Sequence, residues 1–383
     1  MAGKRAAGRL RVLVAGVLVA TLALSGCDSI KRAVDKGSGA SNSPGSSGGS
    51  SSDPGVSPDG ATVEQAAELF DTTLGRVVGN VRDLGDTAGQ LLLQKYWTPQ
   101  RLGAATEREP VVDESVQASA EASATAGPAG PEQVGGPAAA PSAGSAGRGV
   151  PGLPSSGGAI PQASGKVFFR DPGDGKDHKC SAAAVNSGTR RLLATAAHCV
   201  HSGKDGRWMQ NWVFISQYQA GSTLNALSAF PARTLRTFDV WIAEGNGDKY
   251  TTDKAFSHDV AFVTTANGFS GKRIVDQYGG YGIRTGGYPV RPADVRVLGY
   301  PKNMDGGNVE QECVAPLIPR KVFVEVACNY GPGSSGGPWV WRFPEIGWLV
   351  GVTSTADSSR FRRNYSPRFG SDVWAMYQAT ARD

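Results

Sequence analysis

Gly333-Ser334-Ser335-Gly336-Gly337-Pro338 sets a serine between glycines in the last part of the chain. Glycines on both sides let the backbone turn tightly and aim its N–H groups at one point, where side chains would obstruct them. A serine hydroxyl is a poor nucleophile at neutral pH. It acts only with an imidazole that takes its proton and a carboxylate that orients the imidazole. The motif therefore directs attention to one histidine and one acid elsewhere in the sequence.

The histidine and the acid stand in two strings upstream of the serine. His198 lies in Thr195-Ala196-Ala197-His198-Cys199, after a small apolar run that suits a buried strand end. Asp259 lies in His258-Asp259-Val260-Ala261-Phe262 and opens an apolar run typical of a core strand. The order His, Asp, Ser excludes the subtilisin and hydrolase-fold arrangements, whose triads follow other orders.

The three strings resemble the signatures of trypsin-like serine peptidases of the chymotrypsin fold. A fourth, Val297-Leu298-Gly299-Tyr300-Pro301, is similar to a segment of the bacterial glutamyl-endopeptidase-like branch. The resemblance covers about Lys166 to Asp383. It implies a serine endopeptidase without a cofactor, acting on peptides or proteins. The residues that it implies are His198 as general base, Asp259 as its orienter, Ser335 as nucleophile, and the N–H groups of Gly333 and Ser335 as oxyanion hole.

The chain departs from animal members of the family just before the nucleophile. Ser334 stands where they carry an aspartate, so a new N-terminal ammonium has no carboxylate to pair with, and activation by that route is not expected. The resemblance also implies a primary specificity pocket, for which we expect Asn329, Tyr330, Ser354, Thr355 and Ala356. No aspartate stands at the expected pocket floor, and Thr353 replaces the histidine of glutamyl-specific relatives. Neither a basic nor a glutamyl preference is therefore predicted.

Five cysteines are present, and an even remainder of four follows if Cys27 is modified separately. The resemblance implies a disulfide between Cys180 and Cys199, which leaves Cys313 and Cys328 to pair with each other. A zinc site is the alternative, because His178, His198 and His201 crowd near two of these cysteines. Their spacing is not that of structural zinc motifs, so no metal is expected.

Residues 1–26 have the pattern of a lipoprotein signal peptide. Basic residues precede a short apolar stretch, and Leu24-Ser25-Gly26-Cys27 reads as a lipobox, with a plain signal anchor as the alternative. Lipidation of Cys27 would attach the protein to the extracytoplasmic face of a bacterial membrane, and clipping of a linker would release it. Removing four basic residues lowers the formal charge from +5 to +1 (5 − 4), which gives no reason to expect a nucleic-acid partner.

Two stretches, 27–61 and 98–165, are rich in Gly, Ser, Ala and Pro and are predicted to be disordered linkers. Between them, residues 62–97 carry an apolar stripe at helical spacing that ends before Pro99. Several glycines weaken this helix. It is predicted either to bind a partner or dock on the protease domain as a prosegment, or to serve as a spacer.

The region 166–383 reads as short strands broken by turn residues, which predicts an all-β fold of two antiparallel six-stranded barrels with the active site between them. A final helix, capped by Ser371 or Asp372, is expected to follow. The complete triad favours an enzyme. The alternative is a silent peptidase fold that acts as a binding module of the cell envelope. The strands expected are 166–169, 180–185, 191–196, 212–216, 240–243, 260–264, 295–300, 322–327, 338–341 and 348–354.

Overall fold

The computed structural model describes residues 93–108, 111–112, 132–138, 163–246, 249–250, 252–287, 294–341, 347–357 and 361–383. All of them belong to one unit, Ser57–Asp383. The predicted signal peptide 1–26, the linker 27–61 and the helix over 62–92 lie outside these residues. Among the residues that are described, no helix combines the length and the apolar character that crossing a bilayer requires.

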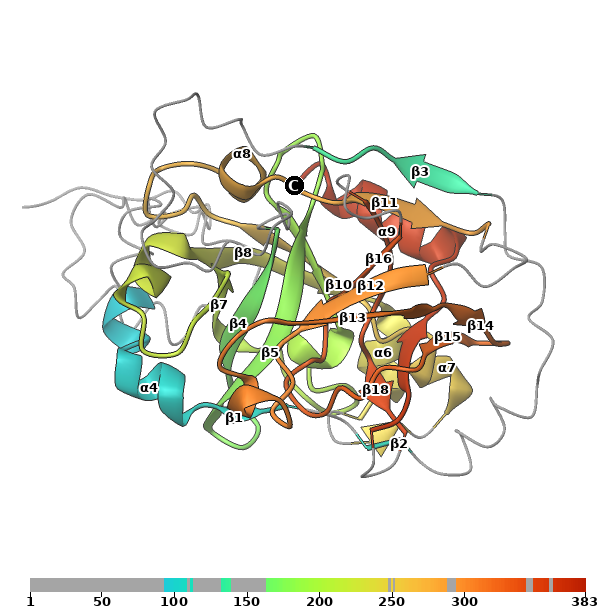
Figure 1. Cartoon of the computed structure of the whole chain (residues 1–383), viewed down its shortest axis with the longest axis horizontal. Coiled ribbons are helices and arrows are strands. Elements are labelled where there is room, and N and C mark those ends of the chain that lie inside the picture. The colour runs from blue at the N-terminus through green and yellow to red at the C-terminus, as the bar shows by residue number, and fades with distance from the viewer. Residues whose placement is uncertain are drawn as a thin grey trace, which may run out of the picture. The chain divides into compact units, whose positions relative to one another are not determined.

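The first half of the protease region is a closed six-stranded barrel (Figure 1). Its strands pair in the order β5-β4-β7-β8-β10-β6, and β6 returns to β5, so that the sheet has no free edge within the barrel. A further short strand, β1, joins β5 from outside in parallel register. The barrel strands are β4 Ser164–Asp171, β5 Lys176–Val185, β6 Leu192–Thr195, β7 Gln210–Ser216, β8 Ala229–Thr237 and β10 Ala261–Thr265.

Small and branched side chains fill this barrel. Ala182, Ala183 and Ala184 on β5 are fully buried, as is Val263 on β10. Phe262 belongs to the same hydrophobic core. Because consecutive side chains of a strand point to opposite faces, the apolar runs that predicted strands at these positions are buried on both faces of the barrel sheet.

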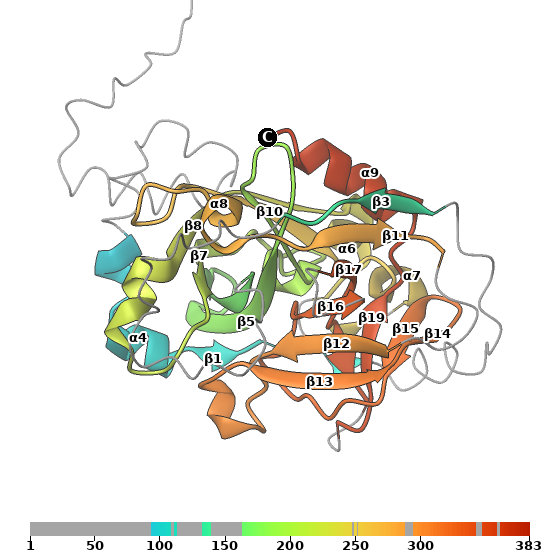
Figure 2. The ribbon, with the colours of Figure 1, turned by 45° about the horizontal axis from the view of Figure 1, so that its top comes forward.

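The second half contains two sheets. One has the strand order β13-β12-β16-β17-β11-β3 and the other β14-β15-β19-β18, and Figure 2 shows β3 alongside β11 at the edge of the first. The Val352 N–H donates to Ser366 Oγ at 3.0 Å and links the two sheets. Among the strands that the structure describes, no pairing closes them, so the second barrel stays a prediction. The strands are β3 Gln133–Gly135, β11 Gly282–Thr285, β12 Asp294–Gly299, β13 Gln311–Pro316, β14 Ile318–Pro319, β15 Phe323–Val326, β16 Pro338–Trp341, β17 Trp348–Val352, β18 Thr355–Ala356 and β19 Asn364–Pro367.

Short helices occupy the connections. The predicted strand 240–243 is wrong, because these residues lie in helix α6, where Trp241 is fully buried and its indole N–H donates to the His201 carbonyl at 2.9 Å. The last helix begins after Gly370, which is its N-cap in place of Ser371 or Asp372. The helices are α4 Pro99–Ala104, α6 Asp239–Glu244, α7 Asp253–Phe256, α8 Ile274–Tyr278 and α9 Ser371–Thr380, with 3-10 turns at η2 Ala197–Cys199, η3 Thr223–Ser228 and η4 Asp305–Gly307.

The predicted disordered linker 98–165 is wrong where the structure describes it. Helix α4, the strands β1 Thr106–Glu107, β2 Val111–Val112 and β3, and the first residues of β4 all fall within it. The reason is a set of anchoring side chains that composition does not reveal. Trp97 and Leu102 are buried, and the Trp97 indole N–H donates to the Asn211 carbonyl at 2.7 Å.

Candidate active site

His198 and Asp259 are joined by two hydrogen bonds. His198 lies in η2, directly after β6, and Asp259 lies just before β10, which pairs with β6. Asp259 Oδ1 accepts from the backbone N–H of His198 at 2.9 Å, and His198 Nδ1 lies 2.9 Å from Asp259 Oδ2. Both side chains are fully buried. The pairing of two adjacent strands thus fixes the imidazole against the carboxylate.

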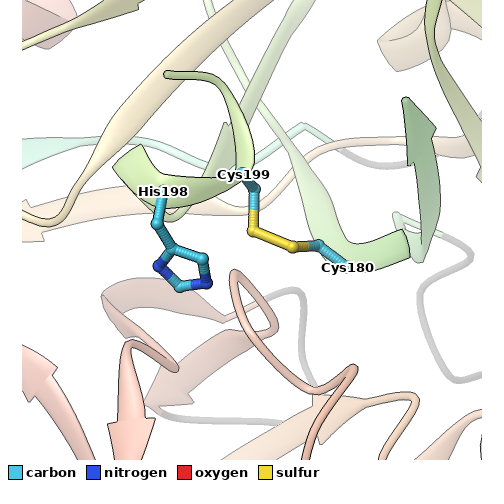
Figure 3. A group of neighbouring side chains, drawn as sticks. All are labelled: Cys180, His198 and Cys199. Atoms are coloured by element: carbon cyan, nitrogen blue, oxygen red, sulfur yellow. A yellow bond between two sulfur atoms is a disulfide. The ribbon is translucent and has the colours of Figure 1, made fainter. Parts of the chain in front are cut away.

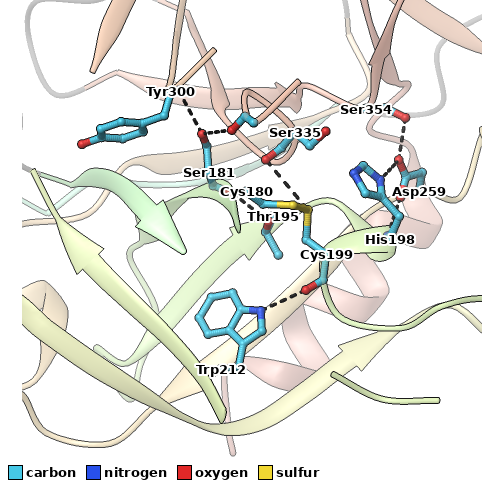
Figure 4. Close-up of a disulfide and its surroundings, with 11 residues drawn as sticks. Cys180, Ser181, Thr195, His198, Cys199, Trp212, Asp259, Tyr300, Ser335 and Ser354 are labelled. Atoms are coloured by element: carbon cyan, nitrogen blue, oxygen red, sulfur yellow. Dashed lines mark hydrogen bonds and ion pairs between the residues drawn. A yellow bond between two sulfur atoms is a disulfide. The ribbon is translucent and has the colours of Figure 1, made fainter. Parts of the chain in front are cut away.

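A third donor completes the surroundings of this carboxylate. The hydroxyl of Ser354, which follows β17, donates to Asp259 Oδ2 at 2.6 Å. Hydrogen bonds to the ionised form favour that form, so the carboxylate is well suited to remain charged in a buried place. Ser354 comes from the second half of the fold, whereas His198 and Asp259 come from the first. The site therefore spans the two halves (Figure 4).

Ser335 lies at a glycine turn beside the imidazole. Its carbonyl accepts from the Ser181 N–H at 2.7 Å, and Figure 4 shows its side chain next to His198. On the imidazole, Nε2 is buried and has no hydrogen-bond partner among the described residues. One ring nitrogen is thus held by the acid, and the other, on the side of Ser335 in Figure 4, makes no hydrogen bond to Ser335 or to any other described residue. A hydroxyl that comes within hydrogen-bond distance of this nitrogen can lose its proton to it.

The glycines of the turn are required by close contacts. Gly333 has φ +93° and Gly336 has φ +79°, a region that disfavours other residues. A Cβ on Gly336 would stand 2.1 Å from Thr195 Oγ1 and 2.3 Å from the Ser181 carbonyl oxygen. The backbone of the turn is therefore pressed against the first barrel, and no larger residue fits there.

The turn is also fixed from the other side. Ser181 Oγ donates to the Gly333 carbonyl at 2.9 Å and accepts from the Tyr300 N–H at 3.1 Å. These bonds use the carbonyl of Gly333 and leave its N–H, like that of Ser335, without a partner among the hydrogen bonds of the described residues. Two adjacent unpaired N–H groups at a rigid turn are suited to bind a developing oxyanion.

The expected pocket residues lie in different environments. Ser354 is engaged with Asp259, and the Tyr330 hydroxyl donates to the Val297 carbonyl at 3.3 Å, so its ring belongs to the core of the second half. Asn329 is exposed, and its carbonyl accepts from the Asn303 side chain at 2.8 Å. The last two, Thr355 and Ala356, form β18, which pairs with β19 next to Ser354.

Both disulfides predicted from the resemblance are present. Cys180 pairs with Cys199, and Cys313 pairs with Cys328. Figure 3 shows the first of them next to His198, one ring nitrogen of which lies within 4.8 Å of the two sulfur atoms. Because both sulfurs are in the disulfide, they are not thiolate ligands for a metal. The bridge ties β5 to the residue that follows the histidine.

A second group of potential ligands lies on the β4–β5 hairpin. Oxygen and nitrogen atoms of Asp171, Asp174 and His178 are within 4.8 Å of one another. Asp171 is buried and ion-paired with Arg108, while His178 Nε2 lies 2.9 Å from Asp174 Oδ2. Protein groups thus already satisfy these side chains.

Sequence reasoning placed Ser354 in the pocket and overlooked Ser181. Neither serine has a motif of its own. Ser181 follows the first cysteine of a disulfide, and its part in holding Gly333 depends on a contact across 152 positions of sequence. Only the disulfide between Cys180 and Cys199, which brings β5 next to His198, could have indicated a role for Ser181.

Comparison with solved structures gives the fold. The chain is similar to the protease Anisep from Arthrobacter nicotinovorans, with a TM-score of 0.50 and 24% identity over 59% of this chain and 99% of that one. It is also similar to the thermostable serine protease AL20 from an extremophilic microorganism (TM-score 0.49, 26% identity, 58% and 98% covered). A third similar structure is a Glu endopeptidase in complex with MPD (TM-score 0.45, 14% identity, 57% and 91% covered). No protein-family model and no curated protein matches the chain. The likeness to Anisep shows that the two chains share a fold.

Proposed function

We propose that the protein is a serine endopeptidase that hydrolyses peptide bonds through an acyl-enzyme on Ser335. The observation that carries this proposal is the buried His198–Asp259 pair, whose imidazole leaves Nε2 without a hydrogen-bond partner on the side of Ser335 in Figure 4. An imidazole held by a carboxylate, with its second nitrogen available to a serine on a glycine turn, supports nucleophilic catalysis. The shared fold with a protease supports the same function.

The mechanism follows from the roles of three side chains. His198 Nε2 takes the hydroxyl proton as Ser335 Oγ forms a bond to the substrate carbonyl carbon, and the carbonyl oxygen becomes an oxyanion. The imidazolium then gives this proton to the leaving amine as the C–N bond breaks. Water enters, loses a proton to His198 and attacks the acyl-enzyme, and the returned proton restores the Ser335 hydroxyl. Asp259 stays ionised throughout and stabilises the imidazolium.

The oxyanion is bound by the N–H groups of Gly333 and Ser335. Ser181 and Gly336 hold the turn in place, so these donors are positioned before the substrate arrives. Donors that need no rearrangement act more strongly in a buried site than in water. Loss of one such donor typically lowers the rate about 100-fold or more.

Substrates are peptides or proteins, and the acyl part of the substrate is assigned to β18. Thr355 and Ala356 follow Ser354, which contacts Asp259 directly, so this strand lies beside the reacting groups. The enzyme is assigned to the extracytoplasmic side of a bacterial membrane through Cys27, with release by clipping as the alternative. Two disulfides in the fold suit an oxidising compartment.

The test uses a fluorophosphonate probe, which phosphonylates activated serines, and a protein substrate such as casein. We expect the wild-type chain to be labelled and to cleave the substrate, and Ser335→Ala to do neither. Ser270→Ala, at an exposed serine, is the matched control and keeps both signals. Folded, disulfide-intact protein that is neither labelled nor active, even when cut as described below, would identify a binding module instead.

A further inference from the structure

Glu107 lies against the glycine turn of the active site. It belongs to β1, which pairs in parallel with β5, so that Glu107 stands opposite Lys179. Its Cγ would be 3.0 Å from a Cβ built on Gly333, whose N–H is one of the oxyanion donors in the proposed mechanism. The carboxylate side chain is 6% exposed. A residue from the region upstream of the barrel thus lies against the turn that carries Ser335.

Two lysines hold this carboxylate. Glu107 Oε1 lies 3.0 Å from Lys179 Nζ, and Oε2 lies 3.1 Å from Lys302 Nζ. Burial alone raises the pKa of the Glu107 carboxyl, but the hydrogen bonds and charge of Lys179, with a further bond from Lys302, hold it below its ordinary value. The Lys179 side chain is only 10% exposed, so without an acid beside it the ammonium would be largely buried and unpaired. With the upstream segment in place, the two ammonium groups thus form a site for an anionic group, although the Lys302 side chain is 63% exposed.

The upstream segment continues across the site. The Arg108 N–H donates to the Lys179 carbonyl at 3.2 Å, and the buried Arg108 guanidinium pairs with Asp171. Further on, β2 pairs in parallel with Lys249–Tyr250, which form β9, and lies beside β18, as Figure 1 also shows. Residues 106–108 therefore contact β5, and residues 111–112 lie beside β18.

We propose that Lys179 and Lys302 form a carboxylate-binding subsite on the leaving-group side of Ser335, which Glu107 fills in the intact chain and an Asp or Glu side chain of the substrate fills once the upstream segment is displaced. The proposal rests on the proposed function, because it assigns the acyl part of the substrate to β18 and therefore the leaving part to β5. The substrate class is peptides with an acidic residue after the scissile bond. The intact chain is a latent form of the enzyme.

The direction of the segment explains why it blocks the site without being cleaved. It runs from β5 toward β18, from Thr106 to Val112. A substrate with its acyl part along β18 and its leaving part along β5 runs the opposite way. The described residues 106–108 and 111–112 thus run in the direction opposite to that of a substrate, a direction that does not present them for cleavage.

The test introduces a recognition sequence for a site-specific protease within residues 113–131 of the full chain, so that the fold forms before the segment is cut. The values of kcat/KM for a set of fluorogenic peptides are measured before and after the chain is cut and diluted. Each peptide carries Glu, Gln or Lys at one of the first three positions after the scissile bond. We expect cutting to raise kcat/KM about tenfold or more, and the cut enzyme to prefer Glu over Gln at one position by about tenfold, as is typical of a charge-assisted pair.

Substitutions identify the subsite. Lys179→Gln and Lys302→Gln should each lower kcat/KM for the Glu peptides about tenfold and so remove the preference for Glu over Gln. Lys272→Gln, at an exposed lysine elsewhere, is the matched control. Glu107→Gln should raise the activity of the uncut chain. A synthetic peptide of residues 93–112 should inhibit the cut enzyme, and the same peptide with Glu107→Gln should inhibit it about tenfold less.

Fluorophosphonate labelling separates the failure of this proposal from the failure of the proposed function. If Ser335 is labelled but cutting changes no activity and no position prefers Glu, the subsite and the latency are wrong and the peptidase assignment stands. If Ser335 is not labelled even after cutting, the peptidase assignment fails and the subsite falls with it.

Discussion

Ser354 Oγ donates to Asp259 Oδ2 at 2.6 Å, and the same oxygen lies 2.9 Å from His198 Nδ1. One carboxylate oxygen therefore serves two partners from different halves of the fold. Hydrogen bonds from Ser354 and from the His198 N–H favour the ionised form of the Asp259 carboxylate, and this charge lies against the imidazole. The contact also fixes the second half of the fold, which carries Ser335, against the first.

Ser354→Ala should lower kcat by about tenfold with a smaller effect on KM, because the imidazole is held less firmly. Steady-state hydrolysis of one peptide by the wild type and by Ser354→Ala separates kcat from KM. An unchanged kcat would show that Ser354 only packs at the interface.

Gly336→Ala should abolish labelling of Ser335 and reduce the yield of folded protein. Its Cβ would collide with Thr195 Oγ1 and the Ser181 carbonyl, neither of which can move without shifting the first barrel. Gly271→Ala is the control, because Gly271 has a similar positive φ of +75° but nothing within 4 Å of its Cβ. If both variants lose labelling and folded yield equally, backbone strain alone, and not the collision of the Cβ, explains the effect.

Because of Lys166, the free energy of unfolding should depend on pH between pH 7 and 10. Burial among the rings of Phe168, Tyr218 and Tyr300 lowers the pKa of its ammonium from 10.5 to about 7. In this range the unfolded chain holds a proton that the folded chain has lost, so stability rises with pH, by at most about 1.4 kcal/mol per unit. The window ends near pH 10 because burial raises the pKa of Tyr300, so stability falls as unfolded tyrosines ionise.

Chemical unfolding of wild type and Lys166→Met at several pH values checks this slope. The wild type should gain stability relative to the variant as the pH rises from 7 to 10. The neutral amine of Lys166 still donates to the Gly307 carbonyl, at 2.5 Å in the structure, so the wild type keeps this bond across the range. A constant difference between the two proteins would contradict a lysine pKa near 7.

Replacing Cys313 and Cys328 by serine should lower the stability by about 3 kcal/mol, the value expected for a loop closed over 15 residues. Activity at low temperature should persist, because neither residue contacts His198, Asp259 or Ser335 in the described contacts. The variant without Cys180 and Cys199 should lose activity as well as stability, since that bridge holds the residue next to His198. Thermal unfolding and peptide hydrolysis separate the two effects.

The sequence predicted the parts of the fold that depend on local pattern. The runs at Leu192–Thr195 and Ala261–Thr265 became barrel strands because apolar residues there are buried on both faces. The run 240–243 is also apolar but became helix α6, because burial of Trp241 against the loop of His201 decided its conformation. Short apolar runs do not distinguish these two outcomes without their tertiary neighbours.

The upstream segment shows a different limit. The composition of 98–165 indicated a linker, yet Arg101 pairs with Asp177, and Tyr96, at the end of the predicted helix 62–97, donates to the same carboxylate at 2.8 Å. These contacts join residues that are 76 and 81 positions apart, and no local pattern records them. The position of Glu107 against Gly333 could not be predicted for the same reason. The pairing of His198 with Asp259, in contrast, could be predicted because each residue lies in its own short motif.

The most direct test of the account is the rate at which the fluorophosphonate modifies the cut chain, with the modified residue identified by peptide mass mapping. We predict a single phosphonylated residue, Ser335, and a rate at least about 100-fold lower in His198→Ala, because the imidazole must take the hydroxyl proton. Modification at another residue, or an equal rate in the two proteins, would contradict the assignment of Ser335 as a nucleophile activated by His198.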